Sequence, residues 1–131
     1  DIVCFLAATL LRGVAWRFYP TTLLAQADSC IGSKSSINVG PYKNQLGTFT
    51  PPADVVIGPR VLDTLAPVGL RSGIGEIIKV HVISGWDDVS ALQRDYPCLA
   101  KDRDVLLGYI RRALEIKQAK IEADEFDMDT M

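Results

Sequence analysis

The sequence predicts an α/β region followed by an all-α region, on the basis of three observations. Short β-branched or aromatic runs occur at residues 15–19 and 54–58. Between them, residues 31–50 are rich in Gly, Ser and Asn, which is typical of turns and hairpins. From residue 70 onward the apolar residues follow helical spacing. We therefore expect α/β structure in residues 1–60 and helices in residues 61–131.

The first region is expected to begin with a helix. Residues 2–11 are apolar almost all round and stop at Arg12 and Gly13, which predicts a buried helix. Four further elements are expected in this region, each bounded by proline, glycine or small polar residues: a strand at 15–19, one or two helical turns at 22–29, a hairpin within 31–50, and a strand at 54–58.

The second region is expected to be helical throughout. Pro59 and Arg60 open a short helix, and longer helices are predicted at 70–83 and 86–96, the latter closed by Pro97. A last helix, from Asp102 as its cap to about residue 123, carries an apolar seam. Its members are Leu106, Ile110, Leu114 and Ile121.

Composition excludes several classes of protein. The 131 residues carry a net charge of −2, which argues against a general attraction to nucleic acid. The charge is uneven, since residues 1–50 hold 2 acidic and 4 basic residues whereas residues 87–131 hold 11 acidic and 7 basic. No apolar run approaches the roughly 20 residues of a membrane span. We expect a cytoplasmic protein that does not associate with membranes, with an anionic ligand held by the first half.

The cysteines indicate a reducing compartment. Their number is odd, and Cys4, Cys30 and Cys98 show no CxxC spacing, so neither a disulfide framework nor a thiolate zinc site is expected. All three are interpreted as buried, unreactive thiols.

Glu76 and Lys79 are the first candidates for a functional site. The surrounding helix is apolar on nearly every face, and a buried charge is costly unless it is paired or bound to a ligand. At positions i and i+3 the two side chains are neighbours, so a mutual ion pair is one interpretation. The other is a carboxylate ligand for a divalent metal beside a lysine that binds an anionic substrate.

Lys117 repeats this pattern on the last helix. It lies in line with the apolar seam, where a lysine either extends its amine to the solvent or serves a site. His81, the single histidine, is interpreted as a hydrogen-bonded core residue.

The segment from Pro20 to Asn44 supplies the remaining candidates. It gathers Asp28, Lys34 and Lys43 among small, hydroxylated and amide side chains. Lysines, an asparagine amide and exposed backbone N–H groups together are typical of a phosphate-binding loop.

These residues, in this order, resemble the 3-dehydroquinate synthases and the wider sugar-phosphate cyclases. The matching segments are ATLLRG, YPTTLLAQADSCIGSK, the hairpin INVGPYKNQLGTF, LDTL, SGIGEIIK and EIKQAKIEADEFD. The resemblance implies the end of a Rossmann-like nucleotide-binding domain joined to the start of a helical metal-binding domain. It also implies a lyase with NAD and a divalent metal, zinc or alternatively cobalt, that acts on an anionic sugar phosphate as a homodimer.

The resemblance assigns a role to each candidate. Glu76 would be a zinc ligand, and Lys79 would hold the substrate's carboxylate end. Asp28 and Lys117 would contact hydroxyls near the oxidised carbon. The substrate phosphate would be held by Lys34, Asn44 and, from the partner subunit, Arg12. The residues along NAD would be Thr21, Thr22, Asp28, Lys43 and Thr64.

The family's glycine-rich pyrophosphate turn would lie before Asp1, and its two zinc-binding histidines after the DEFD segment. The chain is therefore expected to be the central part of such an enzyme and to be inactive alone. Three alternatives stay open: another cyclase, of the 2-epi-5-epi-valiolone or 2-deoxy-scyllo-inosose synthase type; a metal-dependent alcohol dehydrogenase; and a truncated, non-catalytic interaction domain.

Overall fold

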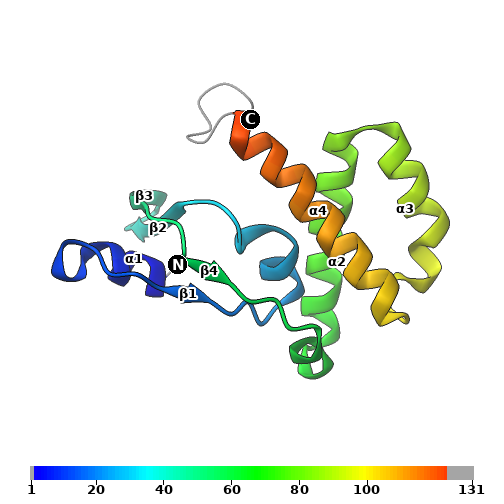
Figure 1. Ribbon diagram of the computed structural model, residues 1–131, viewed down its shortest axis with the longest axis horizontal. Coiled ribbons are helices and arrows are strands. Elements are labelled where there is room, and N and C mark those ends of the chain that lie inside the picture. The colour runs from blue at the N-terminus through cyan, green and yellow to red at the C-terminus, as the bar shows by residue number, and fades with distance from the viewer. Residues whose placement is uncertain (1, 124–131) are drawn as a thin grey trace.

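The computed structural model describes residues 2–123 and divides them into two regions. One holds α1 (Ile2–Thr9), the 3-10 turn η1 (Leu10–Arg12) and all four strands, and the other holds the three long helices. Figure 1 shows the strands and α1 at one end and α2, α3 and α4 at the other. A helical turn, η2 (Ala25–Ser29), packs against both α2 and α4 and so joins the two regions.

The strands form two small sheets. β1 (Arg17–Phe18) and β4 (Asp54–Val55) pair in parallel, with Arg17 opposite Asp54. β2 (Lys34–Val39) and β3 (Tyr42–Phe49) form an antiparallel hairpin, with Gly40 at positive φ in the turn between them. The predicted hairpin is confirmed. Both predicted outer strands exist, although each is shorter than expected.

The prediction of a buried first helix is wrong. α1 buries only Cys4 and Ala7, and it packs on the hairpin strands rather than inside a core. Ile2 is 75% exposed and Leu6 is 51% exposed. Residues 2–11 are apolar almost all round, but no second layer among the described residues covers the outer face of this helix, so most of these side chains stay exposed.

The helical region consists of α2 (Pro67–Ser84), α3 (Trp86–Leu99) and α4 (Arg103–Ala123), preceded by the 3-10 helix η3 (Pro59–Thr64). α2 starts three residues earlier than predicted, because proline suits the first helical turn, where no N–H is needed. Asp102 caps α4 as predicted, since its Oδ1 accepts hydrogen bonds from the backbone N–H of Asp104 and Val105.

Pro97 does not close α3, which continues to Leu99. Proline removes the hydrogen bond that a backbone N–H would donate to the carbonyl four residues earlier, but in the last turn this loss disturbs only the end of the helix. Leu99 is fully buried in the core, and that packing holds the last turn in helical conformation.

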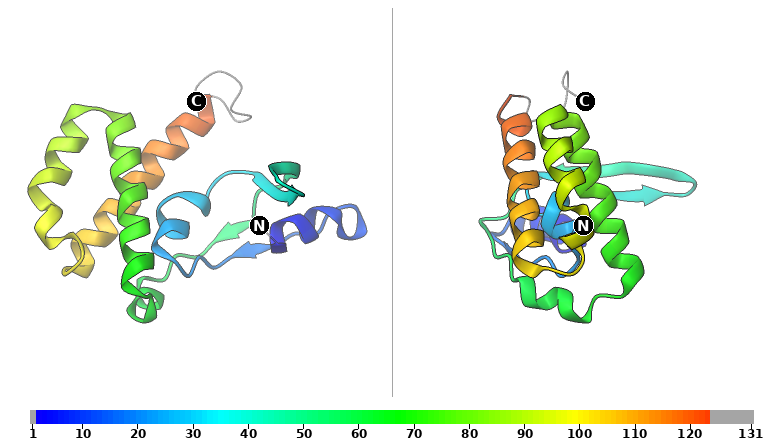
Figure 2. Two further views of the ribbon diagram at one scale, coloured as in Figure 1. Left: turned by 180° about the vertical axis from the view of Figure 1, so that it is seen from behind. Right: turned by 90° about the vertical axis from the view of Figure 1, so that its right-hand side faces the viewer.

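The hydrophobic core lies within the helical region and the turn η2. Leu23 and Ala27 contribute from the η2 segment, Leu62 from η3, and the rest comes from α2, α3 and α4. No residue of α1 or of the hairpin belongs to this cluster. Figure 2 shows the hairpin projecting away from the helices in the right-hand view. His81 is buried within this region and its Nδ1 lies 2.8 Å from the Ile77 carbonyl oxygen, as expected for a core histidine.

The order of elements agrees with an α/β region followed by helices, while a domain boundary at residue 60 stays a prediction. No helix within residues 2–123 is long and apolar enough to cross a membrane. Cys4 and Cys30 are buried as predicted, but the prediction for Cys98 is wrong, since it is exposed on α3. Residues 124–127, the end of the segment EIKQAKIEADEFD, lie outside the described residues.

Candidate functional site

The turn η2 places Asp28 at the junction between the two regions. Its backbone follows a π-helical pattern, in which the N–H of Cys30 donates to the carbonyl of Ala25 at 2.9 Å. Thr22 supports the start of the turn, because its Oγ1 accepts from the N–H of Ala25 at 3.2 Å. Single π turns of this kind are frequent at functional sites.

Asp28 forms an ion pair with Lys117, 89 residues further along the chain. The Lys117 ammonium donates to Asp28 Oδ1 at 2.8 Å and to the Asp28 carbonyl oxygen at 2.7 Å. Each side chain is 26% exposed. Two charge-assisted bonds from one ammonium therefore fix η2 against α4, in a position that a small ligand can still reach.

Glu76 and Lys79 form a second ion pair, on α2, which confirms that interpretation of the two residues. The Glu76 side chain is 17% exposed, whereas that of Lys79 is 57% exposed, so only the carboxylate is largely withdrawn from water. The pKa of Lys79 is raised, mainly by its hydrogen bond to Glu76, with a smaller contribution from the charge of Asp28. Both ion pairs lie where η2 packs against α2 and α4.

α2 closely approaches the two residues that directly precede η2. A Cβ atom on Gly73 would lie 2.4 Å from Leu23 Cγ and 2.7 Å from the backbone nitrogen of Leu24. Only glycine permits this separation. Glu76 follows one turn later on the same helix, so Gly73 sets the distance between the carboxylate and the Asp28 turn.

The predicted phosphate-binding residues are not gathered into this junction. Lys34 lies at the start of β2, and Lys43 and Asn44 lie on β3, all three exposed. Asn44 has a positive φ of 55°, and its Oδ1 accepts a hydrogen bond from Ser36 Oγ at 2.8 Å. Arg12 ends η1, exposed and at a φ of 68°.

The predicted NAD-lining threonines lie on exposed loops beside the junction. Thr21 and Thr22 precede η2, and Thr64 ends η3, where its hydroxyl donates to the Val61 carbonyl at 3.4 Å. Lys43 is on the hairpin, apart from these loops. The structure therefore brings Asp28, Glu76, Lys79 and Lys117 together and leaves the other candidates around them.

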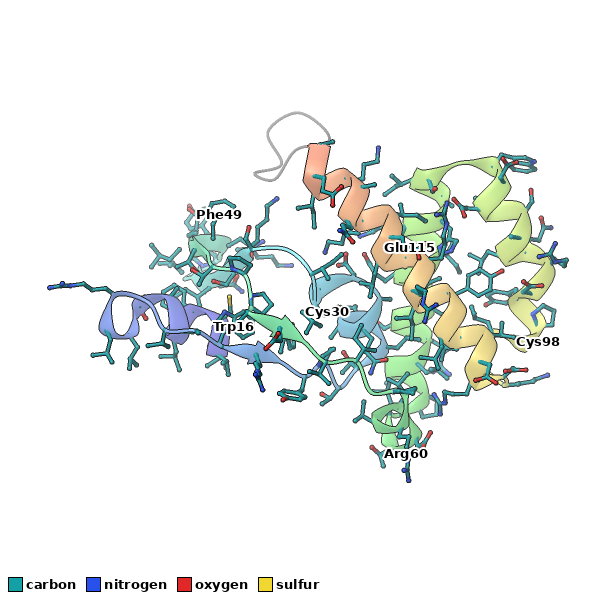
Figure 3. All side chains as sticks on the ribbon, viewed as in Figure 1. Trp16, Cys30, Phe49, Arg60, Cys98 and Glu115 are labelled. Carbon is teal, nitrogen blue, oxygen red and sulfur yellow. The ribbon has the colours of Figure 1, made fainter. Side chains whose placement is uncertain are left out.

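A small cavity of about 90 Å³ lies between the hairpin base, β1 and η2. Lys34 is among its lining residues, with Ser29, Cys30 and Trp16. Figure 3 shows Cys30 between the strands and the helices. Burial raises the pKa of the Cys30 thiol to about 11, so this cysteine is an unreactive lining residue rather than a nucleophile.

The described residues do not by themselves form a metal site. Among residues 2–123, no three His, Cys, Asp or Glu side chains come together as a metal would require. Glu76 offers one withdrawn carboxylate, which suits a divalent metal as a single ligand and is insufficient as a complete set.

Sequence reasoning missed two residues of the junction. Gln26 is fully buried and binds two backbone carbonyls, and Gly73 allows the close helix contact. A polar amide inside the otherwise apolar run of 23–27 was the available signal for Gln26. For Gly73 the signal was a glycine within a predicted helix, which usually has a packing or functional reason.

Comparison with solved structures confirms the fold class. A 2-epi-5-epi-valiolone synthase from Streptomyces hygroscopicus, solved with NAD+ and Zn2+ bound, is 28% identical with a TM-score of 0.85, over 98% of this chain and 37% of that protein. A 2-deoxy-scyllo-inosose synthase, solved with carbaglucose-6-phosphate, NAD+ and Co2+, is 23% identical with a TM-score of 0.81, over 98% of this chain and 35% of that protein. The chain thus has the fold of the end of a Rossmann-like domain joined to the start of a helical one.

Comparison with known sequences identifies the family to which the chain belongs. The 3-dehydroquinate synthase of Enterococcus faecalis is 38% identical over 98% of this chain, and that of Dictyoglomus turgidum is 40% identical over 95%. The chain spans 36% of the length of each of these curated relatives. The family model for the N-terminal part of 3-dehydroquinate synthase matches residues 1–72, more than half of the chain. On this evidence, the chain belongs to the 3-dehydroquinate synthase family.

Proposed function

We propose that this chain is the central part of a homodimeric, cytoplasmic 3-dehydroquinate synthase of aromatic amino-acid biosynthesis. The reaction converts 3-deoxy-D-arabino-heptulosonate 7-phosphate into 3-dehydroquinate by oxidation, phosphate elimination, re-reduction and carbocycle formation. The observation that carries the proposal is the convergence of Asp28, Glu76, Lys79 and Lys117 from three separate segments at one junction. The family membership and the 38–40% identity to curated synthases support it.

When bound, NAD would supply hydride transfer, and a divalent metal, zinc or alternatively cobalt, would polarise the oxygen at the oxidised carbon. Glu76 contributes one ligand to that metal. Asp28 and Lys117 hold the hydroxyls near the oxidised carbon, because a carboxylate accepts and an ammonium donates hydrogen bonds to hydroxyl groups. The NAD-lining positions are Thr21, Thr22, Asp28, Lys43 and Thr64.

The remaining cationic side chains and Asn44 hold the two anionic ends of the substrate, its carboxylate and its phosphate. Lys79 is the more exposed member of its pair, so it can turn from Glu76 to the substrate carboxylate. Lys34 and Asn44 hold the phosphate from the hairpin, and Arg12 reaches it from the partner subunit. A second subunit would explain why Arg12 is exposed on η1 in a single chain.

The test is an assay of phosphate release by the complete protein with NAD and Zn2+. We expect phosphate and 3-dehydroquinate to form together, and Lys117→Met to lower kcat about 100-fold, because it removes the ammonium at the reacting centre. Lys120→Met, on the exposed side of the same helix, is the matched control and should retain full activity. The 131-residue chain alone should release none.

The products separate the proposal from its alternatives. A different carbocycle would indicate another cyclase, an alternative that the similarity to the 2-epi-5-epi-valiolone synthase favours. Net NADH formation without phosphate release would indicate an alcohol dehydrogenase. If the complete protein bound neither NAD nor substrate yet formed a dimer, an interaction domain would be the better description.

A further inference from the structure

Gln26 is a polar side chain that the junction buries completely. It lies on η2, two residues before Asp28, and is 0% exposed. Its Nε2 donates to the Pro20 carbonyl at 3.2 Å and to the Gly58 carbonyl at 3.0 Å. Both partners are backbone acceptors, so the amide must turn its NH2 group toward them. This orientation is fixed by chemistry and does not depend on a choice between amide rotamers.

The two bonds connect three segments of the chain. Pro20 directly precedes Thr21 and Thr22, and Gly58 directly precedes η3, which ends at Thr64. Gln26 itself belongs to the turn that carries Asp28. One amide group therefore ties the turn that carries Asp28 to the residue before Thr21 and Thr22 and to the residue before η3.

Packing alone does not account for glutamine at this position. Within the described residues Gln26 Oε1 is buried without a hydrogen-bond partner, which is a cost that an apolar side chain of the same size would avoid. Such a side chain would instead leave the Pro20 and Gly58 carbonyls without their donor. The amide is thus suited to holding two loops at a fixed distance from η2 rather than to filling space.

We propose that Gln26 is a positioning residue, whose side-chain NH2 group holds the Asp28 turn in register with the loops after Pro20 and Gly58. Its effect on catalysis, which rests on the proposed function, is indirect, since it acts through the placement of Asp28 and of the Asp28–Lys117 pair. Its effect on the geometry of η2 is independent of that function.

The experiment compares two near-isosteric variants, Gln26→Met and Gln26→Glu. The methionine side chain in Gln26→Met has no hydrogen-bond donor at any pH. In Gln26→Glu, burial and the two facing carbonyls raise the pKa of the carboxyl, so its protonated form, which can donate one hydrogen bond, is more populated at pH 6 than at pH 8. The activity of each variant is divided by that of the wild-type protein at the same pH, which removes the pH profile common to all three.

In the complete protein we expect Gln26→Met to lower kcat about 10- to 100-fold at both pH values, because a displacement of about 1 Å has effects of that size. The kcat of Gln26→Glu, relative to wild type at the same pH, should be at least about threefold higher at pH 6 than at pH 8, because one hydrogen-bond donor returns. Gln93→Met, on the exposed surface of α3, is the matched control and should behave as wild type. Wild-type kcat in Gln26→Met, or no pH-dependent recovery in Gln26→Glu, would overturn the proposal.

Amide hydrogen exchange in the 131-residue chain provides a readout that does not depend on activity. The N–H of Cys30, which closes the π turn, should lose protection about tenfold in Gln26→Met, while the amides of α2 and α4 keep theirs. Gln26→Glu should restore that protection at pH 6. Unchanged Cys30 protection would overturn the proposal, even if the complete protein catalysed another reaction. Absence of phosphate release by the wild-type protein would instead contradict only the proposed function.

Discussion

The junction and the hairpin region differ in how they hold their candidate residues. At the junction, Asp28 pairs with Lys117 and Glu76 with Lys79, and η2 packs on the core helices beneath them. On the hairpin, Lys43 and Asn44 are exposed, and none of the core cluster lies in β2 or β3. The chain's own packing therefore preforms the junction, which is proposed to lie at the oxidised carbon, whereas the proposed phosphate-binding part is held by a separate hairpin and η1.

Exposed apolar side chains occur in both regions. Ile2, Leu6 and Leu11 are more than half exposed in the first region, as are Leu46 and Phe49 on the hairpin. Val68, Val82 and Trp86 are also more than half exposed on α2 and α3, so exposed apolar surface does not distinguish the two regions. The junction and its core are expected to carry most of the chain's stability, and the first region to carry little.

The largest contrast should come from core and hairpin truncations. Ile77→Ala removes a fully buried side chain from α2 and should lower the free energy of unfolding by about 2–5 kcal/mol. Leu46→Ala, at a position that is 54% exposed on β3, should lower it by less than about 0.5 kcal/mol. Urea denaturation of the chain measures both. Equal losses would mean that the hairpin is packed against a further surface.

Gly73 tests the close contact that forms the junction. Gly73→Ala places a methyl group within 2.4 Å of Leu23 Cγ, and the overlap should cost about 1–3 kcal/mol of unfolding free energy despite the better helix propensity of alanine. Gly75→Ala is the matched control. Nothing lies within 4 Å of a Cβ atom there, so the same change should stabilise the helix by up to about 1 kcal/mol.

If Gly73→Ala stabilised the chain as Gly75→Ala does, the approach of α2 to the η2 segment would not limit the packing. The comparison uses one helix and one substitution, so helix propensity cancels between the two variants. The remaining difference in urea midpoint measures the contact with Leu23 and Leu24.

Much of the junction was predictable because its charges stand out against an apolar background. Glu76, Lys79 and Lys117 were found from their helical spacing, and the ion pair of Glu76 with Lys79 follows from the geometry of a single helix. The partnership of Asp28 with Lys117 spans 89 residues and depends on how η2 docks on α4, which no local pattern encodes. The roles of these residues toward substrate, metal and NAD stay predictions.

The errors have one physical origin. Periodicity identifies which residues can form a helix, but burial depends on whether another element covers its apolar face. Helical spacing predicted the core positions Leu106 and Ile110 of α4 correctly, whereas Leu114 and Ile121 are only partly buried. The prediction for α1 used apolar composition and failed, because that helix is covered only on the side of Cys4 and Ala7. The extension of α3 beyond Pro97 has the same cause, because the tertiary packing of Leu99 outweighs a local helix-breaking preference.

A double-mutant cycle on Asp28 and Lys117 should separate a withdrawn ion pair from an exposed one. Using Asp28→Asn and Lys117→Met, we expect a coupling free energy of about 1 kcal/mol, because both side chains are largely withdrawn from water. The pair of Arg17 and Asp54 has the same 2.8 Å separation but is 65% and 53% exposed, so its coupling should stay below about 0.5 kcal/mol. Equal couplings would mean that burial at the junction does not strengthen its ion pair.

The smallest expected effect concerns Asp88, which joins α3 to α4 through a two-pronged bond to Arg112, with both nitrogen–oxygen distances 2.8 Å. The Arg112 guanidinium, followed by the Ser84 hydroxyl, lowers the pKa of Asp88 from 3.8 to about 2. A carboxyl whose pKa is lower in the folded state adds stability that is complete above its unfolded value near pH 4 and is lost as the pH falls through about 2.

Asp88→Asn should therefore cost about 1 kcal/mol of unfolding free energy at pH 6, after allowance for solvent screening, and almost nothing at pH 2. Urea denaturation between pH 2 and 6 measures this difference, and Arg112→Met should reproduce it because the same bond is lost. A cost that did not shrink with falling pH would show that Asp88 stabilises the helices by packing, which would leave Asp28 and Lys117 as the pair in which charge matters most.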